Sequence, residues 1–166
     1  MEKEILFREA VESDLETLLQ FEQGIAASER PFDPTLRSGQ IHYYDLREIL
    51  GDKNAKIVVA ELDHRVIASG FGMIRDSEPY LNHDKYVHLR FMYVVPEHRG
   101  KGINKQIIEF LIEWGTSKNI QEFKLEVYDQ NLPAIRAYEK LGFSKYLVQM
   151  RMGRQDKDAS RAQPAL

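Results

Sequence analysis

Arg99, Gly100, Lys101, Gly102 and Lys105 make up the stretch of this sequence that is best suited to chemistry. The two glycines place no side chain over the backbone, so several N–H groups can converge on one ligand. Apolar residues follow at helical spacing, and the first turn of a helix adds unpaired N–H donors and the positive end of its dipole. Together with three basic side chains, these donors predict a binding site for an anion, most naturally a phosphate or pyrophosphate.

The alternative is an ordinary strand-to-helix turn that needs glycine only for its geometry. The sequence does not match either of two common phosphate-binding loop motifs. The sequence contains no Gly-Lys-Ser/Thr, and Lys105 stands where the dinucleotide pattern G-x-G-x-x-G needs its third glycine. A nucleotide-binding switch is therefore disfavoured.

The elements around this turn alternate in a way that predicts an α/β domain. A capping box at Ser13 to Glu16 begins the first helix, and Asn131 begins the last. Hydrophobic periodicity predicts strands over 5–8, 56–62, 66–74, 88–95, 123–127 and 143–152, and further helices over 45–50 and 103–118. This order predicts a mixed, mostly antiparallel sheet with helices on both faces. The strands that end near Val95 and Val127 should be parallel neighbours, joined by a right-handed crossover. Gly70 and Gly72 predict a bulge or a close approach within a strand.

Two motifs resemble the GNAT superfamily of N-acetyltransferases. The R-G-x-G sequence from Arg99 to Gly102, which follows a strand ending in Val-Val-Pro, resembles the acyl-CoA-binding signature of that family, with Asn104 in place of its final small residue. The residues from Asn131 to Phe143 match the family segment N-x-x-A-x-x-x-Y-x-x-x-G-F. Together the matches span residues 92–143. This half of the chain also resembles bacterial enzymes that acetylate the N-terminal amine of ribosomal proteins.

The resemblance implies a single GNAT-type domain that uses acetyl-CoA as cosubstrate, with no metal. It places Tyr138 as the acid that protonates the leaving thiolate and Glu126 as the base that takes the amine proton. Asn131 would hold the pantetheine arm. The remaining acetyl-CoA-binding positions implied are Met92, Tyr93, Val94, Arg99, Gly100, Lys101, Gly102, Ile103, Asn104 and Lys105.

Each of these residues also has a purely structural interpretation. Asn131 is a favoured helix N-cap, and Tyr138 lies on an apolar helix face that suits core packing. Glu126 could be a solvated strand carboxylate. His88 is a rival base, because histidine titrates near neutrality. The segment that would overhang the acceptor offers five candidate wall residues: Phe32, Asp33, His42, Tyr43 and Tyr44.

The length and composition of the chain exclude several further classes of protein. The 166 residues fit one domain, which we expect over 1–153, with a polar tail over 154–166. There is no cysteine, so disulfides and thiolate chemistry are excluded. A net charge of −3 argues against a nucleic-acid surface. The sequence has neither a long apolar run nor a signal-peptide pattern, so we expect a cytoplasmic protein without membrane contact, and a homodimer is allowed.

These observations lead to a functional hypothesis. We expect an N-acetyltransferase in which a primary amine, on a small molecule or a peptide, attacks acetyl-CoA directly in a ternary complex. The alternative is a non-catalytic acyl-CoA-binding module that has kept the turn and lost turnover.

Overall fold

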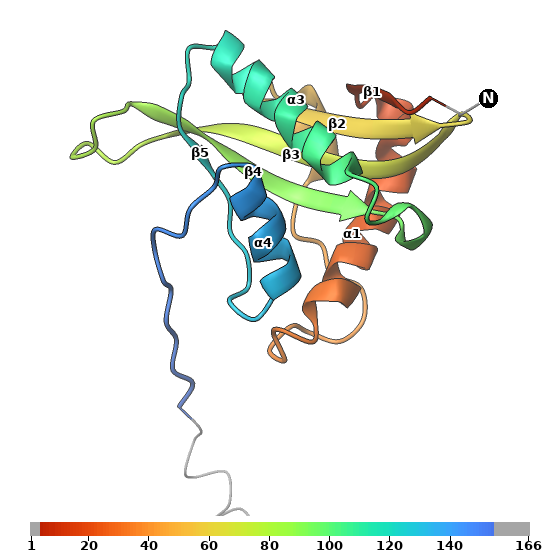
Figure 1. The fold of residues 1–166 in the computed structure, drawn as a ribbon. Coiled ribbons are helices and arrows are strands. Elements are labelled where there is room, and N and C mark those ends of the chain that lie inside the picture. The colour runs from red at the N-terminus through yellow and green to blue at the C-terminus, as the bar shows by residue number, and fades with distance from the viewer. Residues whose placement is uncertain (1–3, 155–166) are drawn as a thin grey trace, which may run out of the picture.

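The structure is a computed structural model that describes residues 4–154. Its centre is a five-stranded sheet whose strands lie in chain order (Figure 1). The strands are β1 (Leu6–Glu9), β2 (Ala55–Leu62), β3 (Arg65–Asp76), β4 (Lys85–Val94) and β5 (Phe123–Lys124). Successive strands from β1 to β4 are antiparallel to one another, and β5 is parallel to β4. The predicted mixed, mostly antiparallel sheet is confirmed.

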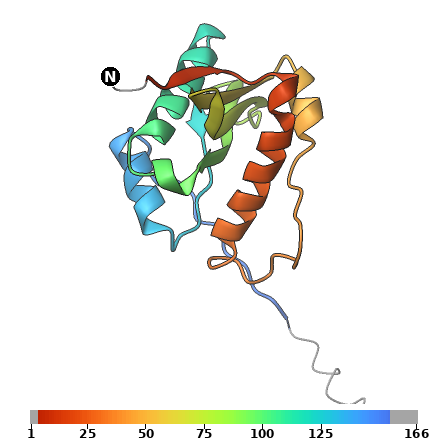
Figure 2. The ribbon, with the colours of Figure 1, turned by 90° about the vertical axis from the view of Figure 1, so that its right-hand side faces the viewer.

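Helices cover both faces of this sheet, as predicted (Figure 2). They are α1 (Leu15–Glu29), α2 (Leu46–Gly51), α3 (Ile103–Ser117) and α4 (Leu132–Lys140). Two separate hydrophobic clusters hold the layers together. Under α3, the buried side chains of Ile107 and Leu111 pack on Val58 and Leu89. Under α1 and α2, Leu18 packs with residues of the opposite sheet face.

The β2–β3 hairpin closes through a two-residue turn at Asp63 and His64, with φ values of 49° and 61°. Positive φ at both central residues is the hallmark of a type I′ turn, whose twist matches that of the strands. The predicted strands at 56–62 and 66–74 are thus joined as a hairpin, and these angles assign its turn to type I′.

A bulge interrupts β4 where it faces Gly70. Ser69 pairs with Tyr93 and Phe71 with Arg90, so Phe91 and Met92 together oppose that one glycine. Phe91 has a φ of 62°. A Cβ at Gly70 would lie 2.5 Å from the sulfur of Met92, so this position requires glycine. The close approach predicted at Gly70 is confirmed.

The parallel contact between β4 and β5 is short. Only Val87 with Phe123 and His88 with Lys124 are paired, and β5 ends before the predicted 123–127. Beyond His88 the two strands separate, which leaves that edge of β4 without a strand partner. Backbone donors and acceptors on this edge are therefore available to a ligand.

Two predicted local features are wrong. The first helix has no cap from Ser13: a 3-10 turn at Glu12–Asp14 precedes it, and the carboxylate of Asp14 accepts the Val11 N–H at 2.8 Å. Arg8 fixes that carboxylate through an ion pair and lowers the pKa of Asp14.

The second wrong prediction is the strand at 143–152. The chain leaves α4 through Gly142, at a φ of 100°, and residues 143–154 form no strand. The physical reason is that no other strand lies within hydrogen-bonding distance of them in the described part of the chain.

Candidate functional site

The turn between β4 and α3 presents unpaired backbone donors, as the sequence predicted. Gly100 and Gly102 have φ values of 74° and 75°, and Gly102 caps α3. Within residues 4–154, no N–H from Gly100 to Lys105 donates to a backbone carbonyl. A Cβ at either glycine would meet no heavy atom within 4 Å, so the turn faces open space. These donors at a helix N-terminus suit an anion.

The basic residues of the turn have different roles. Arg99 donates from Nε to the carbonyl of Val94 at 2.9 Å, and its guanidinium lies 5.7 Å from the ring centre of Tyr93. It therefore ties the turn to the end of β4. The ammonium groups of Lys101 and Lys105 make only long contacts, 3.4 Å and 3.7 Å, with groups of their own turn and helix. Both side chains are free to move toward an anion.

Tyr138 reaches the same turn from α4. Its ring meets Phe143 edge to face at 6.1 Å and packs on the core beneath α3. Burial raises the pKa of Tyr138, and the neighbouring side chain of Asn104 lowers it in part, so the phenol is protonated at neutral pH. The Oδ1 atom of Asn104 is buried and has no hydrogen-bond partner among the described residues. The structure thus brings Tyr138 beside the first turn of α3, a proximity that the sequence motif does not state.

Asn131 caps α4, as its alternative interpretation predicted. Its side chain accepts the Ala134 N–H at a long 3.4 Å. Among residues 4–154, the side-chain amide nitrogen of Asn131 has no acceptor, so it is available to a ligand beside the helix start.

The two candidate bases lie together where β4 and β5 meet. The carboxylate of Glu126 is 2.8 Å from Arg90 and 3.9 Å from Nε2 of His88. The side chain of Glu126 is 71% exposed and that of His88 only 16% exposed. Burial, with help from Arg90, lowers the pKa of His88, so its imidazole is neutral at pH 7. Both groups can accept a proton.

Glu22, which the sequence analysis missed, organises the segment at residues 41–44. This side chain on α1 is fully buried. Its carboxylate accepts the N–H groups of Tyr43 at 2.8 Å and Tyr44 at 3.2 Å, and it lies 2.9 Å from Nδ1 of His42. The available signal was its spacing: Glu22 falls four residues after Leu18, within the buried stripe of α1.

We expect Glu22→Ala to destabilise the protein by roughly 2–4 kcal/mol, because two buried N–H groups lose their acceptor. Glu22→Gln keeps one oxygen for both donors and should cost less than about 1 kcal/mol. Denaturant unfolding of the two variants measures the difference. If both variants lose the same stability, a single oxygen at position 22 is not sufficient to hold the segment at 41–44.

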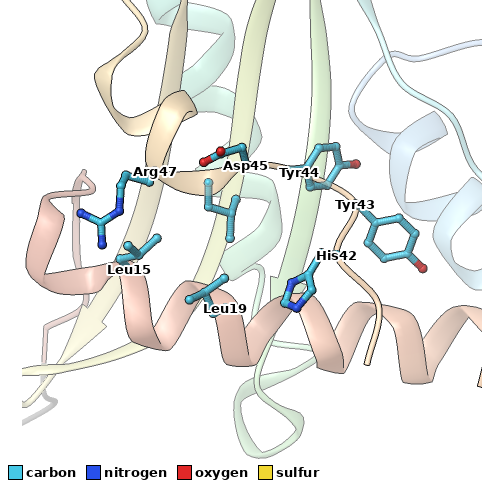
Figure 3. A pocket seen from close by; sticks show the side chains of 8 residues that line it. Leu15, Leu19, His42, Tyr43, Tyr44, Asp45 and Arg47 are labelled. Carbon is cyan, nitrogen blue, oxygen red and sulfur yellow. The ribbon is translucent and has the colours of Figure 1, made fainter. Parts of the chain in front are cut away.

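Three of the predicted wall residues line two neighbouring cavities. Tyr43 and Tyr44 line both cavities, and in the smaller one, of about 200 Å³, they meet His88 and Arg90. The guanidinium of Arg90 lies 5.7 Å from the ring centre of Tyr44. His42 lines only the larger cavity, of about 530 Å³, which lies between α1 and the start of α2 (Figure 3). That cavity touches neither the turn nor Tyr138.

Phe32 and Asp33 lie at the far end of α1, beside the chain that follows β5. Phe32 stacks on Tyr128 with ring centres 5.8 Å apart. Asp33 pairs with Arg151 at 2.8 Å, and hydrogen bonds with Arg151 and Thr35 lower the pKa of Asp33 to about 2. Tyr128 and Arg151 are further residues of this region that the sequence did not single out.

The fold and the turn together define an acetyltransferase-type domain, in which a helix start with unpaired N–H groups lies beside a strand edge without a strand partner. The family model of the Acetyltransferase (GNAT) family matches residues 20–143, and the chain belongs to that family.

Individual relatives agree with this assignment. The uncharacterized N-acetyltransferase YobR of Bacillus subtilis is 41% identical over 61 residues, which cover 37% of this chain and 25% of YobR. An aminoglycoside N(6')-acetyltransferase type 1 of Salmonella typhimurium is 28% identical over 107 residues, covering 63% of this chain and 72% of that enzyme. The chain thus spans about a quarter of the length of YobR.

A solved structure shares the fold. A predicted acetyltransferase with acetyl-CoA, from Clostridium acetobutylicum, superposes with a TM-score of 0.71 at 19% identity, covering 90% of this chain and 96% of the other. No helix within residues 4–154 has the length and apolar character needed to cross a membrane.

Proposed function

We propose that this protein is an N-acetyltransferase that transfers the acetyl group of acetyl-CoA to a primary amine. One observation carries the proposal. Tyr138 on α4 lies beside Asn104, which belongs to the first turn of α3. The free N–H groups of that same turn suit a pyrophosphate. A single ligand can therefore be anchored at the turn and reach the phenol. CoA has this form, with a pyrophosphate at one end and a thioester at the other.

The binding mode follows from the unpaired edge of β4. The pyrophosphate accepts N–H groups from Gly100 to Lys105, with Lys101 and Lys105 nearby. The amides of the pantetheine arm add to the free edge of β4 at Met92, Tyr93 and Val94, as an extended peptide adds to a sheet. The side chain of Asn131 binds the same arm from the other side. Arg99 and Ile103 support the site by holding the turn and the helix start in place.

The chemistry assigned to these residues is a direct transfer. The amine nitrogen attacks the thioester carbonyl, and a backbone N–H at the bulge near Met92 donates to the oxyanion that forms. Glu126 accepts the proton of the amine. The C–S bond then breaks, and Tyr138 gives its proton to the sulfur as CoA leaves.

The acceptor is a primary amine on a small molecule or a peptide. The similarity to an aminoglycoside acetyltransferase supports a small molecule, and the motif resemblance supports the N-terminus of a ribosomal protein. Release of CoA across a panel of such amines tests the proposal. A non-catalytic acyl-CoA-binding module would bind CoA and release none with any amine. The cytoplasmic location stays a prediction, which cell fractionation tests.

The assignment of the base has its own test in the pH profile. If Glu126 takes the proton, Glu126→Gln lowers the rate most on the acid side, where little free amine is present. If His88 does, His88→Gln removes an inflection that lies below about 6.5, because burial lowers its pKa. A neutral His88 is present above that inflection and is lost as the pH falls through it. We expect the first result, and unchanged profiles in both variants would remove both residues from this role.

A further inference from the structure

The cavity of about 200 Å³ beside the candidate bases is lined by charged groups of one sign. Its two charged side chains are Arg75, near the end of β3, and Arg90 on β4. No aspartate or glutamate of residues 4–154 lines it. Arg90 lies opposite Phe71, four positions before Arg75, so alternate residues of these two strands face the cavity.

The two arginines differ in their partners. The guanidinium of Arg90 is held by Glu126 at 2.8 Å and lies over the ring of Tyr44. Arg75 forms an ion pair with no carboxylate in the described part of the chain. The neighbouring Asp76 points to the opposite face of the sheet and pairs with Lys85 instead. Arg75 therefore brings to the cavity a positive charge that no described carboxylate neutralises.

A third cation adds to this surplus of positive charge. Lys124 on β5 lies opposite His88, and its ammonium nitrogen is 4.4 Å from the ring centre of Tyr86. The pKa of His88 reflects the surplus. Burial lowers this pKa, and the charges of Arg90, Arg75 and Lys124 lower it further, whereas the charge of Glu126 raises it.

Two carboxylates lie behind the tyrosine side of the cavity, but both have donors of their own. The buried carboxylate of Glu22 accepts the backbone N–H groups of Tyr43 and Tyr44. The carboxylate of Glu29 accepts the hydroxyl of Tyr43 at 2.7 Å. Neither of these glutamates lines the cavity. Near the cavity, three cations thus face one available carboxylate, that of Glu126.

The pyrophosphate of CoA does not account for this charge. Arg75 is paired with Tyr86, which stands eight residues before Val94 at the end of β4. At roughly 3.3 Å per residue, Arg75 lies on the order of 25 Å from the turn that begins after Val94. The cationic cavity is therefore at the other end of the strand from the proposed CoA anchor.

We propose that the acceptor amine carries a carboxylate of its own, which binds Arg75 in this cavity. The preferred acceptor is then a small amino carboxylate, and this assignment rests on the proposed acetyl transfer. The planar guanidinium group suits a carboxylate, because it can donate two parallel hydrogen bonds. A volume of about 200 Å³ is below that of most drug-sized ligand sites, so the cavity fits a small head group. The amine of the same molecule lies toward Glu126, which Arg90 holds nearby.

The test compares α-, β- and ω-amino acids with their carboxamides, which keep the shape and lose the negative charge. CoA release gives kcat/KM, and calorimetry with the CoA-saturated protein gives the affinity. For the best acceptor, we expect the carboxylate to exceed its carboxamide by about 10- to 100-fold in both measurements. Equal values, or a preference for the carboxamide or for spermidine, overturn the proposal. A preference for phosphoethanolamine over every amino carboxylate also overturns it, because the anion would be a phosphate.

Variants of Arg75 locate the effect. Arg75→Gln should bring the ratio of carboxylate to carboxamide close to one, through a higher KM for the carboxylate. Arg75→Lys keeps the charge without the fork and should retain part of the preference. Arg65→Gln removes an exposed arginine from the other end of β3 and is the matched control, with an unchanged ratio. If Arg75→Gln keeps the ratio of the unmodified protein, Arg75 does not bind the acceptor and the proposal is wrong.

The two measurements separate this proposal from the proposed function. Tight binding of amino carboxylates without CoA release by any amine would support the cationic cavity and contradict acetyl transfer. CoA release without a carboxylate preference would support acetyl transfer and contradict the role of Arg75. Neither binding nor release with any member of the panel would contradict both.

Discussion

Replacing Tyr138 by phenylalanine should lower kcat by about 10²- to 10⁴-fold, with a much smaller change in the KM for acetyl-CoA. The substitution removes only the hydroxyl, and the ring keeps its contact with Phe143. Stability should therefore change little. Because burial raises the pKa of Tyr138, the phenol is protonated at neutral pH and can supply the proton that the proposed reaction gives to the departing sulfur. Steady-state kinetics with acetyl-CoA as the varied substrate measure both parameters.

Tyr80→Phe is the matched control, since it removes the hydroxyl of an exposed tyrosine far from the turn. It should leave both parameters unchanged. If Tyr138→Phe turns over within a few-fold of the unmodified protein, Tyr138 is a packing residue and the thiolate receives its proton from another source.

Replacing Gly102 by glutamate should abolish the stabilisation of the protein by CoA. At about 100 times its dissociation constant, a ligand adds roughly 2.7 kcal/mol to the free energy of unfolding. In a protein of this size that raises the Tm by roughly 5–10 °C. A carboxylate at Gly102 brings negative charge to the N–H groups that would bind the pyrophosphate, at a φ of 75° that side chains rarely adopt.

Gly102→Gln separates the charge from the strain, because it has the same shape and the same unfavourable φ. It should retain part of the rise in Tm that Gly102→Glu loses. Parallel melts with ATP in place of CoA test the nucleotide alternative. If CoA does not raise the Tm of the unmodified protein, CoA does not bind and the proposed function is contradicted.

The sequence predicted the parts of this fold that depend on local patterns. Helix α3 follows from apolar residues at 3.6-residue spacing, and its start follows from Gly102. The hairpin between β2 and β3 follows from two apolar runs around a short polar turn. Such features need only neighbouring residues, so one sequence suffices to find them.

The features that the sequence did not predict depend on residues far apart in the chain. The cap of the first helix was misplaced because Arg8 fixes Asp14 from another element. The role of Glu22 depends on a segment some twenty residues later, which supplies its donors. The predicted strand at 143–152 has the right pattern, but a strand also needs a partner, and pattern alone does not supply one.

The candidate site was predictable to a similar degree. The turn and Tyr138 came from motifs, whereas the adjacency of Tyr138 to Asn104 required the packing of α4 against α3. The proximity of His88 to Glu126 likewise required the register of β4 with β5.

The two hydrophobic clusters, one on each face of the sheet, support different parts of the candidate site. The turn and Tyr138 rest on the cluster beneath α3, and Tyr44 rests on the cluster beneath α1 and α2. The sheet lies between the two clusters and separates them. Under the proposed function, substitutions in the segment at 41–44 would change the amine side of the site without loosening the helix start that would hold CoA. Divergence toward new amines would then leave the CoA side intact, and an engineer can vary the segment at 41–44 for the same reason.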